Sequence, residues 1–179
     1  MVLIGITGGS LFFQAENMAV ALSYTTNVSF IGCTATLITT CMAIAMVKSV
    51  KADTRLVLGS LIALAGVGIV IFNGQFVLHL NPLGDLLALL SAMAWAVYSL
   101  LMKRASSRYG AVFITRKVFF YGLITILPMF AIEPWTFPLR DFLKPTIWFN
   151  LLFLGLVASF VCFALWSWVI RKIGAMKAS

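Results

Sequence analysis

The stretch GDLLALLSAMAWAVYSLLMKR, residues 84 to 104, decides the fold. Between Asp85 and Lys103 it carries no charged side chain, and a helix of about 20 apolar residues crosses the hydrocarbon core of a bilayer. A membrane-spanning strand would alternate polar and apolar residues, which this run does not do. The stretch therefore predicts a membrane-spanning α-helix.

The rest of the chain has the same character, because 62% of its 179 residues are hydrophobic and only 10% are charged. A soluble domain of this size keeps a largely polar surface and cannot bury so much apolar side chain. Backbone groups in lipid must pair within the chain, and long unbroken apolar runs achieve this as helices. We predict an all-α integral membrane protein with the lipid bilayer as its partner.

Six apolar runs are long enough, or nearly so, to cross the bilayer. We place these spans at 2–24, 26–47, 56–78, 84–102, 111–132 and 147–170. The three cysteines lie inside such runs, with no CxxC pair and no neighbouring histidine to complete a metal site. We therefore expect them to be packing residues, and the sequence predicts no metal and no cofactor.

The distribution of basic residues between the loops gives the orientation. Alternate connections carry eleven Lys and Arg residues, and the remaining connections carry only Arg140 and Lys144. Since cytoplasmic loops are enriched in Lys and Arg, the first span is predicted to run outward and the sixth to return inward. The formal net charge of +8 is thus interpreted as membrane topology, with no nucleic acid as a partner.

An internal repeat is indicated by aligning residues 5–29 with residues 155–179, an offset of 150 without a gap. Identical or small residues coincide at a few positions, and the hydropathy profiles agree. The two segments are predicted to run in opposite directions, as repeats of inverted topology with an odd number of helices require. Completing both repeats would give five helices each and a parent of roughly 290 residues.

Three segments resemble the EamA-like branch of the drug/metabolite transporter (DMT) superfamily. They are ALSYTTNVSFIGCTATLITT, GSLIALAGVGIVIFNG and, most characteristically, GDLLALLSAMAWAVYSLLMKR. The resemblance implies a ten-helix bundle made of two inverted five-helix repeats. On that basis residues 1–78 are expected to form helices three to five of the first repeat. Residues 79–179 would form helices six to eight and the start of nine, in a chain truncated at both ends. One departure from the family pattern, MVKSVKADTR after the fourth family helix, leaves the subgroup unassigned.

The resemblance also implies a function: a multi-pass transporter of the bacterial inner membrane that moves a small metabolite or drug-like molecule by alternating access, with efflux as the expected direction. A membrane-embedded enzyme is the alternative from another class. Such an enzyme needs a constellation of polar groups, and one intramembrane acid without a partner does not provide it. A third alternative is a transporter fragment that is inactive alone.

Glu16 is the acidic residue that lies within an apolar span, and an intramembrane carboxylate is a functional candidate because its burial is costly. It lies about 12 Å inside the outer end of its span, near the midplane where inverted-repeat carriers bind substrate. The carboxyl must be protonated, paired, hydrated in a cavity or matched by a cationic substrate, and proton coupling is therefore left open. The competing interpretation is a neutral glutamic acid bonded to Asn17 or a hydroxyl.

Trp95 and Tyr98 form a polar-aromatic stripe with Ser91, at i, i+4 and i+7 of one helix. The family resemblance implies that this helix borders the central cavity. Trp166 and Ser167 are the repeat partners of Glu16 and Asn17, so that symmetry would place them on the opposite wall. The alternative for each aromatic residue is interhelical packing. A carboxylate and an indole together would suit a cationic or amphipathic substrate.

Overall fold

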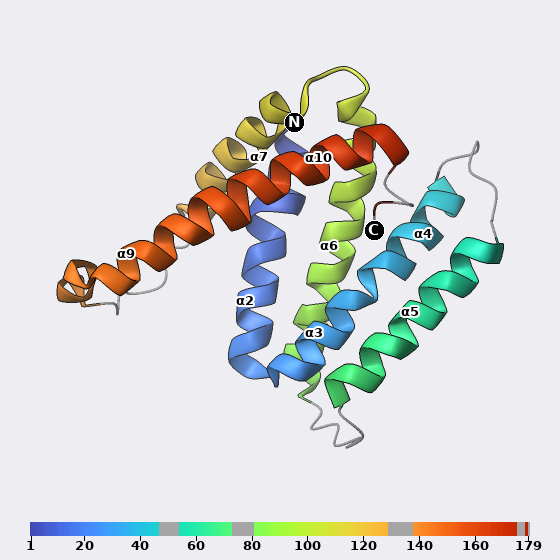
Figure 1. Cartoon of the computed structure of the whole chain (residues 1–179), viewed down its shortest axis with the longest axis horizontal. Coiled ribbons are helices and arrows are strands. Elements are labelled where there is room, and N and C mark those ends of the chain that lie inside the picture. Colours follow the sequence, from blue (N-terminus) through green and yellow to red (C-terminus); the bar gives the residue numbers. More distant parts are fainter. Residues whose placement is uncertain (47–53, 73–80, 129–137, 175–177, 179) are drawn as a thin grey trace.

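The computed structural model describes residues 1–46, 54–72, 81–128, 138–174 and 178. Within these ranges the regular structure is entirely helical, which confirms the predicted all-α fold. Six helical rods correspond to the six predicted spans (Figure 1). The boundary expected between residues 78 and 79 lies outside the described residues.

Several rods are built from more than one helical element. The first rod joins α1 (Val2–Gly5), the π-helical η1 (Ile6–Leu11) and α2 (Phe12–Leu22). The second joins α3 (Thr25–Cys33) and α4 (Ala35–Met46). The next three are α5 (Thr54–Phe72), α6 (Pro82–Ser106) and α7 (Ala111–Ile126). After the 3-10 helix η2 (Leu139–Leu143), the last rod joins α9 (Pro145–Leu152), the π-helical η3 (Phe153–Val161) and α10 (Cys162–Ile173).

Proline residues, rather than the apolar character of the sequence, mark where two of these helices begin. Pro82 and Pro145 begin α6 and α9, where a missing N–H costs nothing. The α7 helix ends at Ile126, and Leu127 after it keeps helical backbone angles. Residues 129–132 of the span expected at 111–132 lie outside the described residues.

In the described ranges, three helical rods have the length and the apolar composition needed to cross a membrane. These are Thr25–Met46, Pro82–Ser106 and Pro145–Ile173, and a shorter apolar helix covers Val57–Ile69. Such helices confirm an integral membrane protein.

The α6 helix lies at the centre of the bundle and packs against α2, α3 and α4, with α2 to its left and α4 to its right in Figure 1. An alanine stripe on α6 makes this possible, since Ala88, Ala92 and Ala96 are each at most 1% exposed. Small side chains allow helices to approach closely in membranes, where packing rather than the hydrophobic effect drives association.

Glycines provide the contact between the first rod and α7. A Cβ built on Gly9 would lie 2.9 Å from Gly122 Cα, and one built on Gly5 would overlap Tyr121. Beside this crossing, the Thr125 hydroxyl donates to Ser10 Oγ over 2.8 Å. Gly5 and Gly9 therefore allow α7 to approach the first rod closely.

Hydrogen bonds at the two ends of α6 join it to α2 and α10. At its start, Ser23 Oγ donates to Asp85 Oδ1 over 2.7 Å and Asn81 Nδ2 donates to Leu22 O over 2.6 Å. At its end, Lys103 Nζ donates to Ile170 O over 3.4 Å. The C-termini of α2 and α10 therefore lie at opposite ends of α6.

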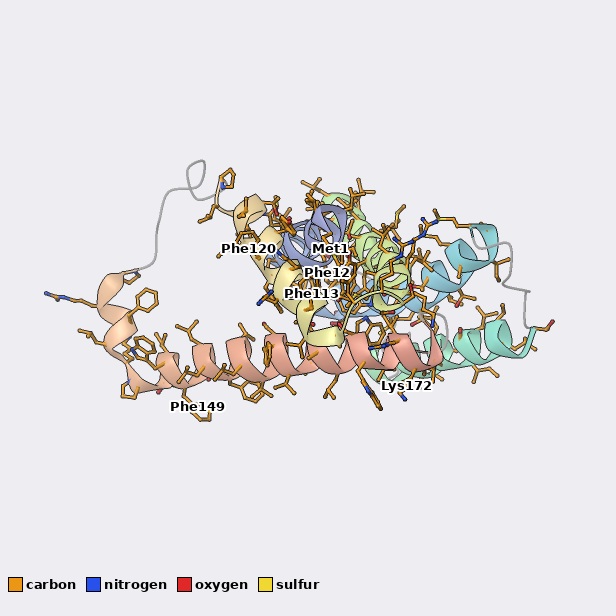
Figure 2. All side chains as sticks on the ribbon, turned by 90° about the horizontal axis from the view of Figure 1, so that it is seen from above. Met1, Phe12, Phe113, Phe120, Phe149 and Lys172 are labelled. Atoms are coloured by element: carbon orange, nitrogen blue, oxygen red, sulfur yellow. The ribbon has the colours of Figure 1, made fainter. Side chains whose placement is uncertain are left out.

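The last rod leaves the bundle along part of its length. Only α10 contains buried side chains, and α9 and η3 contain none. Figure 2 shows Phe149 on the portion that projects away from the other helices, while Lys172 lies at the end beside the bundle. An apolar helix without protein neighbours is stable in lipid but not in water.

Replacing Gly122 by leucine tests the glycine crossing. The new side chain would overlap the first rod at Gly9, and overpacking of this kind costs about 1–3 kcal/mol. We expect a lower unfolding midpoint in detergent micelles for Gly122→Leu. Gly59→Leu is the matched control, because nothing lies within 4 Å of a Cβ there. Equal midpoints for the two variants would contradict the crossing.

Candidate functional site

A cavity of about 510 Å³ lies between α2, α3, α4 and α6. Ligand sites for small molecules commonly have volumes of about 300–1,000 Å³. Its walls are mixed, with apolar side chains, hydroxyls, one amide and one carboxyl. The lining residues are Phe12, Glu16, Asn17, Val20, Thr25, Val28, Ser29, Gly32, Cys33, Ala35, Thr36, Ser91, Ala92 and Trp95.

Three of the residues singled out from the sequence meet in this cavity. Glu16 and Asn17 reach it from α2, and Trp95 reaches it from α6. Glu16 is half-buried and has no hydrogen bond or ion pair within the described ranges. The arrangement with a neutral glutamic acid bonded to Asn17 is therefore not found in this structure.

The α3–α4 wall of the cavity was not predicted. Thr25, Ser29, Gly32 and Thr36 all line it, and their spacing of four, three and four residues places them on one helical face. This stripe of small and polar residues was a usable signal in the sequence. The predicted span at 26–47 located the helix but did not assign its faces.

Tyr98, Trp166 and Ser167 do not line this cavity but lie next to it in an aromatic cluster around Trp95. The Trp95 ring is 5.2 Å from Tyr98 and 5.4 Å from Trp166, measured between centroids. Phe163 packs edge-on to Trp95 at 5.8 Å. Of the two predicted repeat partners, Trp166 is thus separated from the cavity by Trp95.

Ser167 contributes to the contact between α10 and α7 instead. Its hydroxyl donates to Phe163 O over 2.7 Å and lies 3.3 Å from the Thr115 hydroxyl. Both side chains are fully buried. The role of Ser167 in this structure is therefore helix packing rather than lining of the cavity.

Two polar atoms of the aromatic cluster, Tyr98 Oη and Trp166 Nε1, are buried and have no hydrogen-bond partner in the described part of the chain. Ser167 approaches the Tyr98 hydroxyl, but the two groups do not have hydrogen-bond geometry. Burying a polar group without a partner lowers the free energy of unfolding by about 1–3 kcal/mol. The two atoms therefore destabilise the cluster, which apolar side chains of the same shape would not do.

In the described residues no group of three or more His, Cys, Asp or Glu side chains lies close enough together to hold a metal ion. The arrangement can instead hold a small molecule between a carboxyl, hydroxyls and aromatic rings. These features define a polytopic helical membrane protein with a polar cavity between its helices.

The family follows from comparison with known proteins. Residues 82–179 match the EamA-like transporter family, which is more than half of the chain. This chain therefore belongs to the EamA-like transporter family, as the sequence motifs indicated.

Two similar proteins extend over nearly the whole chain. One is an uncharacterized transporter of Archaeoglobus fulgidus, 23% identical over 173 residues, with 94% of this chain and 57% of the relative covered. The other is a protein of known crystal structure, with a TM-score of 0.73 and 18% sequence identity, over 99% of this chain and 61% of the other. The second likeness concerns the fold alone. This chain spans about three fifths of the length of either protein.

Tyr98→Phe tests whether the Tyr98 hydroxyl has a partner. Removing a buried hydroxyl that makes no hydrogen bond is expected to leave stability unchanged or to raise it by about 1 kcal/mol. Ser167→Ala removes a buried hydroxyl that does bond, and should lower the free energy of unfolding slightly, by about 0.6 kcal/mol. Both changes are measured by denaturant unfolding in micelles. A destabilised Tyr98→Phe would show that the hydroxyl is bonded after all.

Proposed function

We propose that this chain belongs to a small-molecule carrier of the bacterial inner membrane, with its substrate site in the cavity between α2, α3, α4 and α6. The observation that carries the proposal is the half-buried Glu16 carboxyl, which lines this cavity and has no partner among the described residues. An intramembrane carboxyl of this kind faces water or a ligand. Membership of the EamA-like transporter family supports transport rather than catalysis.

Alternating access is the proposed mechanism, with two inverted repeats that rock around the site. Two observations support the repeats. The matching segments α2 and α10 have their C-termini at opposite ends of α6, and each follows a π-helical segment. The change from π-helix to α-helix falls at Phe12 and at Cys162, which are 150 residues apart. This is the offset of the sequence repeat.

The orientation rests on the basic residues around the end of α6. Lys103 and Arg104 close α6, and Arg171 and Lys172 close α10 beside them. Under the positive-inside rule this end of the bundle faces the cytoplasm. The proposed net direction is efflux, and protonation of Glu16 would couple it to protons.

Gly32→Phe tests the cavity without knowledge of the substrate. A Cβ on Gly32 would meet nothing within 4 Å, so that the ring would fill the cavity without displacing backbone. Proteoliposomes containing the chain are loaded with a radiolabelled, protein-free extract of bacterial metabolites, and the compounds that leave are followed. Release should fall roughly tenfold or more in Gly32→Phe, since an obstructed site loses most of its binding energy.

Gly66→Phe is the matched control, because a Cβ there also meets nothing within 4 Å and Gly66 does not line the cavity. It should release labelled compounds at the rate of the unchanged chain. The proposal fails if the unchanged chain releases nothing beyond protein-free liposomes, or if Gly32→Phe releases as fast as Gly66→Phe.

A further inference from the structure

We propose that the cavity selects organic cations that carry an apolar, ring-sized body, and this inference rests on the function proposed above. The charges that line the cavity are its first support. Glu16 is the single charged side chain among the lining residues in the described ranges, and neither a lysine nor an arginine lines it. A cavity with one uncompensated carboxyl attracts positive charge and repels negative charge.

The basic side chains of the bundle are placed elsewhere. Lys103 bonds to the carbonyl end of α10 over 3.4 Å, and Lys117 lies 5.6 Å from the Phe120 ring centroid. Arg116 lies 5.6 Å from the Phe113 ring centroid. In the described part of the chain no internal cation therefore neutralises Glu16, and a ligand can supply the missing charge.

Aromatic rings form a second feature that favours a cation. Phe12 and Trp95 both line the cavity, with ring centroids 4.9 Å apart. Tyr98 and Trp166 pack against the Trp95 ring and restrict its orientation. The negative face of an aromatic ring attracts an ammonium group by about 0.5–2 kcal/mol, more as water is excluded.

One feature favours anions and has to be weighed. The N-terminus of α3 reaches the cavity at Thr25, and a helix N-terminus carries roughly half a positive charge. A full carboxylate charge on Glu16 exceeds this partial charge, and Thr25 is exposed, which weakens the helix contribution through solvent. The net preference is for a cation.

The remaining walls define the body of the ligand. Val20, Val28, Ala35 and Ala92 provide apolar surface, and Ser29 and Ser91 provide neutral hydroxyls. A volume of about 510 Å³ holds a single-ring or two-ring molecule with its ammonium group directed to Glu16. Inorganic cations fit poorly, because only one carboxylate is present to replace their water.

Cys33 is a native reporter inside the cavity. With Cys41→Ser and Cys162→Ser it becomes the single thiol of the chain, since the sequence has three cysteines. A methanethiosulfonate reagent forms a mixed disulfide with this thiol and releases methanesulfinate. The rates are compared for two reagents of opposite charge, one with a trimethylammonium-ethyl group and one with a sulfonato-ethyl group.

The measured quantity is the rate of labelling by the cationic reagent divided by the rate of labelling by the anionic reagent. A change in the reactivity of the thiol affects both rates equally and leaves this ratio unchanged. Glu16→Gln should lower this ratio by roughly five- to tenfold, through loss of one nearby charge in a partly dehydrated site. Asp85→Asn is the matched control, since it removes an equal charge at a residue outside the cavity lining. Its ratio should equal that of the parent.

A second measurement needs no change at Glu16. Benzyltrimethylammonium should slow labelling of Cys33 at least roughly threefold, whereas phenylmethanesulfonate, of similar size and opposite charge, should not. Equal ratios in all variants, or protection by the sulfonate, would overturn the cation preference while the cavity remains a ligand site. Failure of Cys33 to react with either reagent would mean that the cavity is closed to water, and would overturn the proposed function as well.

Discussion

The structure depends on one constraint, which is that lipid offers no hydrogen-bond partner to a polar group. Helices satisfy the backbone, and several hydroxyls of the described helices bond back to their own helix. Thr7, Thr39 and Ser167 each donate to the carbonyl four residues earlier, at 2.7–2.8 Å. A hydroxyl that is bonded to its own helix can lie in the bilayer without a further hydrogen-bond partner.

Glu16 departs from this pattern, as Tyr98 and Trp166 do, but it lines a cavity. Its carboxyl can neither bond back along α2 nor face lipid without a high cost. The cavity walls opposite Glu16 contain small and polar residues such as Ser29 and Gly32. These side chains leave room for water and can contact it. Outside the cavity the first rod packs closely against α7, at Gly9 and Gly122.

Much of this could be predicted from the sequence, because membrane helices are specified by long apolar runs. Within the described residues each of the six predicted runs overlaps a helical rod, and the place of Glu16, Asn17 and Trp95 in a cavity agrees with their helical positions. The two-repeat organisation stays a prediction, strengthened by the shared offset of 150 residues between the starts of α2 and α10.

The rotation of the helices about their axes was predicted less well than their positions. The cavity role expected for Ser167 assumed that α10 turns the same face inward as α2. Instead, Phe163, Ser167 and Ile170 of α10 are buried, and Ser167 pairs with Thr115 of α7. Such rotations are set by tertiary packing between helices, which a repeat alignment does not contain.

The central claim is that an aqueous cavity reaches Glu16 within the bilayer. A nitroxide spin label at Ser29, which lines the cavity, and one at Leu154 on the exposed face of η3 test it directly in liposomes. The label at residue 29 should collide mainly with a water-soluble nickel chelate, and the label at residue 154 mainly with oxygen dissolved in lipid. Oxygen-dominated collisions at both positions would contradict the account.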